Sequence, residues 1–210
     1  NVSRNEFSYN TGGKVVYNLI ENWSSDEWVY YSQEFYTYDD NSNMLTATGE
    51  LWATDVWRND QRHTYTYQNN NMLTGLGETW FDGEWVNTSK ETHTYNGNSR
   101  LTSLFETWDD SMWVNDQSIE YDYNALNLVE TSTEKIWMDD SWLNILKNHF
   151  TYANYNGIES LLVEHWDADD WINFSLNQYE YDEYGNASSG DYFYWNGSNW
   201  TQNQDGLMQV

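Results

Sequence analysis

Residues 101–123 read LTSLFETWDDSMWVNDQSIEYDY and contain one complete unit of the pattern that decides the fold. From Trp113 to Tyr123 the alternate residues are Trp, Asn, Gln, Ile, Tyr and Tyr, and those between them are Val, Asp, Ser, Glu and Asp. A period of two residues predicts a β-strand with two different faces. Residues 101–108 are rich in Thr, Leu and Phe and predict a second strand. The four residues between Trp108 and Trp113 predict a hairpin loop.

The same unit occurs seven times along the chain. All 14 Trp residues fall in Trp-x4-Trp pairs, and successive pairs are 28 or 29 residues apart. An aromatic-x-Tyr motif, such as Tyr121/Tyr123, keeps the same step, as does an Asn two residues after most of the second Trp residues. The pairs are Trp23/Trp28, Trp52/Trp57, Trp80/Trp85, Trp108/Trp113, Trp137/Trp142, Trp166/Trp171 and Trp195/Trp200.

This repetition predicts the fold class and the domain organisation. We expect an all-β chain with a single repeat domain over residues 1–210. It would be an antiparallel meander of seven tandem 28–29-residue β-hairpin repeats, with about 14–15 strands. Such a sheet could be rolled as a barrel, a sandwich or a spiral sheet.

The aromatic residues are expected on one face of the sheet. The two Trp residues of a pair would lie opposite each other, and Tyr121 and Tyr123 are an even number of residues from Trp113. Two interpretations stay open. The aromatic face is the hydrophobic core, or it is partly exposed and stacks on sugar rings whose hydroxyls Asn and Glu can bind.

Composition excludes several classes of protein. The chain has 34 acidic and 8 basic residues, for a net charge of −26, which repels the phosphates of nucleic acids. It has no run of about 18 apolar residues and no continuously apolar strand row, so we expect no membrane insertion. It has no Cys, which excludes disulfides and thiol catalysis.

No catalytic constellation stands outside the repeat, so we expect no enzyme and no obligatory cofactor. The loops between paired Trp residues are acidic, and Ca²⁺ prefers carboxylate and carbonyl oxygens, so calcium is a possible ligand. Asp and Ser are also ordinary turn residues, which is the alternative explanation. The candidate metal ligands are Asp82, Glu84, Asp109, Asp110, Asp139, Asp140, Asp167, Asp169 and Asp170.

Candidate ligand contacts are the second Trp and the following Asn of four repeats, because aromatic rings and amides together suit sugars. They are Trp57, Trp85, Trp113, Trp142, Asn59, Asn87, Asn115 and Asn144.

The stretches YTYDDNSNML at 36–45 and YEYDEYGN at 179–186 resemble the YD repeat, Y-x-Y-D-x-x-G-x-L. YD repeats occur in bacterial Rhs proteins and related secreted surface proteins, and this chain resembles a variant that carries a Trp-x4-Trp hairpin. The resemblance touches all seven units, over about a third of each. It implies a β-hairpin sheet, secretion and an adhesion-type role, and no active site.

Together these observations lead to one expected function and one alternative. We expect a secreted or cell-surface binding module, adhesin-like, that recognises carbohydrate or another surface polymer. The alternative is a structural subunit of an extracellular fibre or surface layer, which self-associates through its sheet edges. The sequence begins at Asn1 without an initiator Met, so we expect a processed or excised segment. The expected location is extracellular or the bacterial cell surface.

Overall fold

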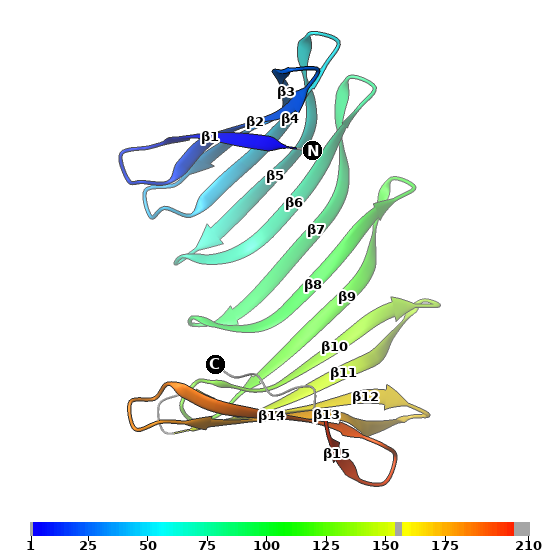
Figure 1. The fold of residues 1–210 in the computed structure, drawn as a ribbon. Helices are drawn as coiled ribbons and strands as arrows, with labels where there is room; N and C mark the ends of the chain where they lie inside the picture. The colour runs from blue at the N-terminus through cyan, green and yellow to red at the C-terminus, as the bar shows by residue number, and fades with distance from the viewer. Residues whose placement is uncertain (1, 154–156, 204–210) are drawn as a thin grey trace. The chain divides into compact units, whose positions relative to one another are not determined.

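The computed structural model describes residues 2–153 and 157–203, which form strands joined by turns (Figure 1). The strands are β1 (Ser3–Tyr9), β2 (Val15–Ser24), β3 (Glu27–Tyr38), β4 (Met44–Ala53), β5 (Val56–Gln68), β6 (Asn71–Phe81), β7 (Glu84–Asn96), β8 (Ser99–Asp109), β9 (Met112–Tyr123), β10 (Val129–Met138), β11 (Ser141–Tyr152), β12 (Ile158–Asp167), β13 (Asp170–Tyr181), β14 (Ala187–Trp195) and β15 (Trp200–Gln202). The all-β prediction and the predicted strand number are confirmed.

The strands follow one another through the sheet in chain order, with β1 and β15 at its two ends. The described strands therefore form one open meander. Of the three predicted forms, the closed barrel is wrong, because β1 and β15 are not paired with each other. By compactness the chain divides into two units, residues 1–93 with 105–115 and residues 94–104 with 116–210. Each unit is described by itself below.

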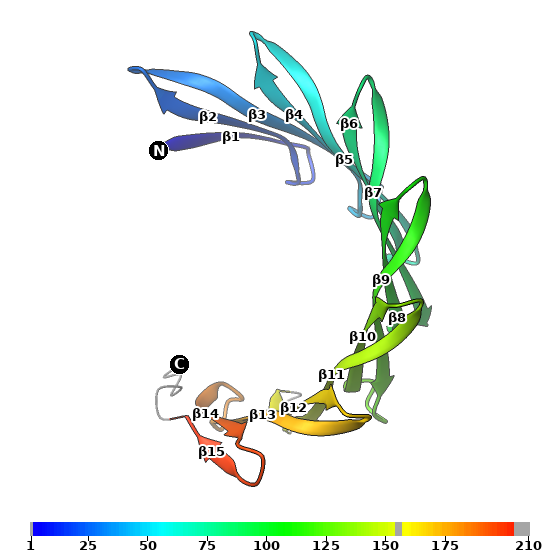
Figure 2. The same cartoon turned by 90° about the vertical axis from the view of Figure 1, so that its right-hand side faces the viewer.

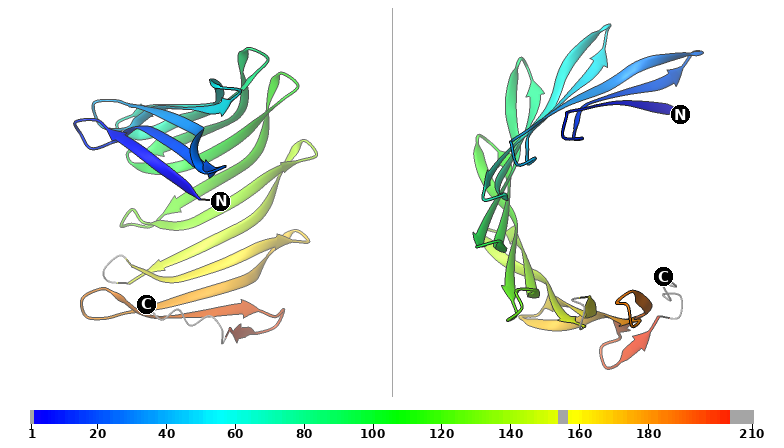
Figure 3. Two further views of the ribbon diagram at one scale, coloured as in Figure 1. Left: turned by 45° about the horizontal axis from the view of Figure 1, so that its top comes forward. Right: turned by 90° about the vertical axis from the view of Figure 1, so that its left-hand side faces the viewer.

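The turn inside six of the seven Trp pairs is tighter than predicted, whereas the Trp195/Trp200 pair keeps four residues between its strands. Trp23 lies opposite Trp28 and Ser24 lies opposite Glu27, so two residues form the turn instead of four. Both turn residues, Ser25 and Asp26, have a positive φ. Two such residues make the type of hairpin turn whose twist matches the flanking strands. The same geometry recurs at 54–55, 82–83, 110–111, 139–140 and 168–169, and Figure 3 shows the hairpins that these turns close.

A substitution in one of these turns should stabilise the protein. Ala168 has a φ of 46°, where the Cβ of an ordinary residue is crowded and Asn is tolerated. We expect Ala168→Asn to raise the free energy of unfolding by about 1 kcal/mol in urea denaturation. Asn69, with a φ of 52°, is the matched position. Asn69→Ala should lower the stability by a similar amount, and equal effects of the same sign would contradict the argument.

A β-bulge in the long strand of the hairpins changes which face each aromatic residue occupies. Asn59 lies opposite Glu50 and Gln61 lies opposite Gly49, so Asp60 has no partner. An extra residue reverses the alternation of all side chains that follow it. The unpaired residues in the other hairpins with this bulge are Tyr31, Thr88, Ile145 and Phe174.

The bulge makes the prediction of a single aromatic face wrong. Before it, the Trp pair and the following Asn lie on one face, which we call the Trp face. After it, the aromatic-x-Tyr residues point to the opposite face, which we call the Tyr face. Contacts between side chains agree with this register. Arg62, which follows the bulge at odd spacing from Trp57, lies over the Trp85 ring and is therefore on the Trp face. Tyr36 bonds to Glu34, two residues earlier on the Tyr face.

The strands of each unit lie in a single layer (Figure 2). Over residues 2–153 and 157–203 no hydrophobic side chain is fully buried, and the most buried groups are polar, such as Ser103, His93 and Asn18. Within the described residues, the aromatic side chains therefore do not form a closed hydrophobic core, and that interpretation of the aromatic face is wrong. Stability must come from strand pairing and from contacts between side chains along each face.

On the Tyr face, the second Tyr of the motif ties the two strands of its own Trp hairpin together in four repeats. The Tyr152 hydroxyl donates a 2.7 Å hydrogen bond to the carbonyl oxygen of Val129. Tyr38, Tyr123 and Tyr181 make the equivalent bond to the residue 23 positions earlier. In these four repeats the second Tyr thus joins the end of one strand to the start of its partner strand, at the end of the hairpin away from the Trp pair.

Removing this hydroxyl should destabilise the chain. We expect Tyr152→Phe to lower the free energy of unfolding by about 1 kcal/mol, because it leaves a half-buried carbonyl without its donor. Chemical denaturation followed by circular dichroism checks this. Tyr184→Phe, in an exposed turn position, is the control, and an equal loss in both variants would show that the bond to Val129 is not responsible.

Candidate functional site

The Trp face carries a ladder of paired indole rings. In all seven pairs the ring centroids lie 4.9 to 5.2 Å apart and the planes cross at 64° to 73°. Edge-to-face packing of this kind is favourable for aromatic quadrupoles. Each pair sits directly opposite across its hairpin, as Trp80 does with Trp85. The pairing predicted from the Trp-x4-Trp spacing is confirmed.

Next to the Trp pairs runs a row of acidic and amide side chains. Glu50 lies opposite Asn59, and Glu78 lies opposite Asn87. In the fifth repeat Lys135 takes the place of the acid and lies opposite Asn144. The predicted contact Asn115 follows Trp113 on β9 by the same two residues. Trp and Asn of each repeat therefore share a face, as expected.

In four repeats a third side chain covers the second Trp of the next hairpin. It lies five residues after the preceding second Trp, or at the equivalent place in β1, and it was not predicted from the sequence. The Arg62 guanidinium lies 4.7 Å from the Trp85 ring centre, and the Lys90 ammonium lies 5.3 Å from that of Trp113. Arg4 over Trp28 and Lys147 over Trp171 repeat the contact at 4.6 and 5.8 Å. We call these residues caps. Their regular spacing from Trp57, Trp85 and Trp142 was a signal in the sequence.

The row of acids holds the caps in place. The two Arg62 nitrogens bond to the two Glu78 oxygens at 2.7 Å each, and Lys90 pairs with Glu106 at 2.5 Å. The hydrogen bonds that Arg62 donates to the Glu78 carboxylate raise the pKa of Arg62 above its usual value. Arg4, Arg62 and Lys90 are thus each held by an ion pair with a glutamate while lying over an indole ring, which is a cation–π arrangement.

The caps differ in what they leave open. In the first hairpin the cap position is Gln33, which bonds to Glu50, and Tyr30 lies 5.6 Å from Trp57. The residue at the cap position for Trp142 is Ser118, whose side chain is too short to cover a ring. Trp142 is 36% exposed. The other six second Trp residues, which also lie in the described part of the chain, are less exposed. Of the four predicted Trp contacts, Trp57, Trp85 and Trp113 are covered, and Trp142 is open.

The acidic turn residues are exposed and mostly serve the turns. Asp82, Asp110, Asp139, Asp140 and Asp169 occupy positive-φ positions. Asp170 accepts a hydrogen bond from the Trp171 amide at 2.8 Å. The other predicted ligands are exposed residues of the same turns, namely Glu84, Asp109 and Asp167. The described residues contain no group of three or more His, Cys, Asp or Glu that could hold a metal ion. Calcium binding stays a prediction without a structural site.

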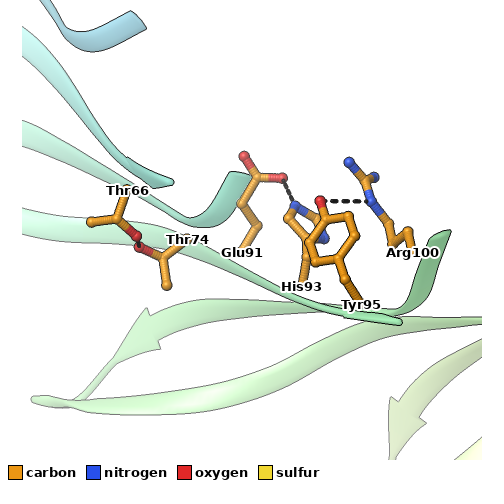
Figure 4. A network of polar contacts seen from close by, with 6 residues as sticks. All are labelled: Thr66, Thr74, Glu91, His93, Tyr95 and Arg100. Atoms are coloured by element: carbon orange, nitrogen blue, oxygen red, sulfur yellow. Dashed lines mark hydrogen bonds and ion pairs between the residues drawn. The ribbon is translucent and has the colours of Figure 1, made fainter. Parts of the chain in front are cut away.

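Figure 4 shows polar contacts from both faces, with Glu91 and His93 on the Tyr face and the Thr66–Thr74 pair on the Trp face. His93 lies 3.2 Å from Glu91 through its Nε2 atom. The hydroxyls of Thr66 and Thr74 meet at 2.6 Å across two neighbouring strands. The first contact lies within β7 and the second joins β5 to β6.

In two of the turns after the aromatic-x-Tyr motif, the Asp of the YD pattern makes the hydrogen bonds that form the turn. The Asp39 carboxylate accepts hydrogen bonds from the backbone amides of Asn41 and Asn43. The side chain of Asn43 adds a third bond and is the main cause that lowers the pKa of Asp39. Asp182 makes the same turn with Tyr184 and Asn186. An acid directly after Tyr-x-Tyr therefore builds the turn between repeats.

The described residues form no helix with the length and apolar character needed to cross a membrane. No family model matches the sequence, and no curated protein matches it.

Several solved structures are similar to this chain. One is a protein of unknown function from Bacteroides fragilis, with 13% identity, a TM-score of 0.47, and coverage of 56% of this chain and 90% of that chain. Another is the structure of TcdB2-TccC3, with 11% identity and a TM-score of 0.44, over 95% of this chain and 12% of that chain. A third is a porin-like protein from Bacteroides uniformis, with 14% identity, a TM-score of 0.35, and coverage of 89% and 96%.

Proposed function

We propose that this chain is a non-catalytic binding module that recognises carbohydrate or another surface polymer through its Trp face. The observation that carries the proposal is the repeated array of half-exposed Trp pairs in a single-layer sheet. Aromatic faces pack well against the C–H surfaces of sugar rings, and the Asn and Glu side chains beside the Trp pairs can bind hydroxyls. An adhesin-like role at the outside of a bacterial cell suits such a surface.

The charge of the protein narrows the ligand class. A net charge of −26 repels nucleic acids, anionic lipid surfaces and acidic polysaccharides at long range. Neutral polymers rich in hydroxyl groups suffer no such repulsion. We therefore expect neutral glycans to bind better than anionic ones, and no binding to nucleic acid.

The YD-repeat resemblance forms part of this proposal. The repeated Tyr hydroxyl bond across the Trp hairpin and the Asp-capped turn give a structural reason for the residues that define the motif. We propose that the seven units are YD repeats with an added Trp hairpin, and that the protein is secreted or displayed at the cell surface.

A panel of neutral and acidic polysaccharides, soluble and insoluble, tests the function. The purified chain is mixed with each, with calcium and with a chelator, and binding is measured by co-sedimentation and by Trp fluorescence. We expect binding to at least one neutral glycan, competed by its soluble oligosaccharides. Loss of binding with the chelator would assign a role to calcium. No binding to any polysaccharide under either condition would overturn the proposed function.

A second candidate function rests on the sheet edge. All seven residues of β1 are exposed, and its outer edge is unpaired in the part of the chain that the structure describes. Such an edge can accept another strand, as in a fibre or surface layer. Sedimentation velocity over a range of concentrations, with electron microscopy, tests this. Concentration-dependent assembly into filaments supports the structural role, and a monomer at every concentration contradicts it.

A further inference from the structure

We infer that the uncovered face of Trp142 is the principal docking position for a neutral sugar ring, in an opening made by Ser118. This inference rests on the proposed function and assigns it to one place in the second unit. The reason begins with the caps, because a ring that is already covered by a protein side chain cannot stack on a ligand.

Seven residues occupy the cap position, one for each Trp pair: six lie five residues after the second Trp of the preceding pair, and Arg4 holds the equivalent place in β1. Six of them have long side chains and the remaining one is Ser118. The set is Arg4, Gln33, Arg62, Lys90, Ser118, Lys147 and Leu176. The register places Ser118 like the others, since it lies opposite Lys135, which in turn lies opposite Asn144, beside the Trp137/Trp142 pair. The exposure of Trp142 follows from this short side chain.

The second departure from the repeat occurs at the same place. Where five other hairpins carry an acid and the seventh carries Phe193, this one carries Lys135, which bonds to Glu120 at 2.7 Å. The opening therefore lacks both the cationic cap and the acid that would hold it. Local breaks of a repeated pattern are expected where a surface has a function of its own.

The reversed charge decides between two kinds of occupant. An aromatic face in an acidic protein could attract an external cation, as Trp85 attracts Arg62. At Trp142 the ammonium of Lys135, paired with Glu120, stands at the position where the anchoring acid would have been, so that position offers no carboxylate to hold a cation over the ring. A neutral pyranose ring needs no such carboxylate. Its C–H face can lie on Trp142, and its hydroxyls can bond to Ser118, Asn144 and the Lys135–Glu120 pair.

The test closes the opening without removing the ring. Ser118→Arg restores a cap over Trp142, and Ser198→Arg, in an exposed turn, adds the same charge elsewhere as the control. Affinity for cellohexaose, laminarihexaose, mannohexaose and the best ligand of the polysaccharide panel is measured by calorimetry. Near-ultraviolet circular dichroism confirms that each variant is folded. We expect Ser118→Arg to weaken binding at least about tenfold and Ser198→Arg to leave it unchanged.

A second pair of variants keeps the test independent of the added arginine. Trp142→Ala should lose binding to a similar degree, whereas Tyr184→Ala removes an exposed aromatic ring away from the opening and should have no effect. Pentalysine is the cationic probe, and we expect it neither to bind at Trp142 nor to compete with the glycan.

Each outcome has a defined meaning. If the unaltered chain binds a neutral glycan and Ser118→Arg or Trp142→Ala binds it equally well, the proposed function stands and the Trp142 position is wrong. If pentalysine competes at Trp142, the ligand class is wrong. If the unaltered chain binds no glycan at all, the proposed function fails and this inference fails with it.

Discussion

Replacing Arg62 by Met should lower the free energy of unfolding by about 2 kcal/mol. The guanidinium makes two 2.7 Å bonds to Glu78, whose side chain is only 10% exposed, and it also lies over the Trp85 ring. Met keeps much of the apolar contact with the ring, but it leaves a carboxylate that is almost fully buried without its partner. An unpaired buried charge is costly even where the intact pair contributes little.

Two controls separate this cause from a general effect of charge removal. Arg58→Met changes the same residue type on the same strand, but Arg58 is exposed and bonds only weakly to Thr54 at 3.2 Å, so we expect a change below about 0.5 kcal/mol. The double variant Arg62→Met with Glu78→Gln removes the unpaired charge and should recover about half of the loss. Urea denaturation measures all three. Equal losses for Arg58→Met and Arg62→Met would show that the Glu78 pair is not the cause.

Most of the architecture could be predicted from the sequence, because the repeat shows the same strand pattern seven times. The Trp-x4-Trp spacing, with its two-residue alternation, predicts a hairpin in each unit, and the structure has them all. The tight turns were read as four residues long because Asp, Ser and Gly at these places suit both lengths. Register across the hairpin, such as Phe81 opposite Glu84, is what settles the length.

The arrangement of faces could not be predicted from the same pattern. The bulge falls on Tyr31, Asp60, Thr88, Ile145 and Phe174, which share no chemical type. No residue preference therefore marks the position where the alternation reverses. A missed bulge moves every later side chain to the wrong face, and so the Tyr pairs were placed beside the Trp pairs.

The candidate site was half predictable for a related reason. Trp and Asn lie before the bulge, so their shared face was predicted correctly. The caps lie after it, at Arg62 and Lys90, and the uncorrected alternation puts them on the opposite face from the rings that they cover. The functional difference between Trp85 and Trp142 depends on those caps. It became visible only once the register was known.

The alkaline limit of stability should be set by Tyr ionisation. Burial is the main cause that raises the pKa of Tyr17, Tyr65, Tyr67, Tyr123 and Tyr152 above the usual 10.0. Burial also raises the pKa of Tyr36, and its 2.6 Å hydrogen bond to the carboxylate of Glu34 raises it further. The folded state therefore keeps protons on these hydroxyls at a pH where the unfolded chain has released them.

The sign of the pH dependence follows from this difference. Above about pH 10 the unfolded state binds fewer protons than the folded state, so the free energy of unfolding falls as the pH rises. The contribution of these hydroxyls is fully present below pH 10 and is lost as the pH passes through the raised values. Because several Tyr residues act together in a chain without a buried hydrophobic cluster in its described part, we expect cooperative unfolding above about pH 10, with phenolate absorbance and loss of circular dichroism rising together.

One variant isolates a single hydroxyl of this set. Tyr36→Phe removes the bond to Glu34 and with it one proton that the folded state retains, so the fall in stability above about pH 10 should be shallower than in the unaltered chain. Tyr184→Phe changes an exposed turn residue and should leave the slope as it was. If all 18 Tyr residues ionise in one non-cooperative step while the circular dichroism stays constant, burial of the hydroxyls does not control the alkaline stability of this sheet.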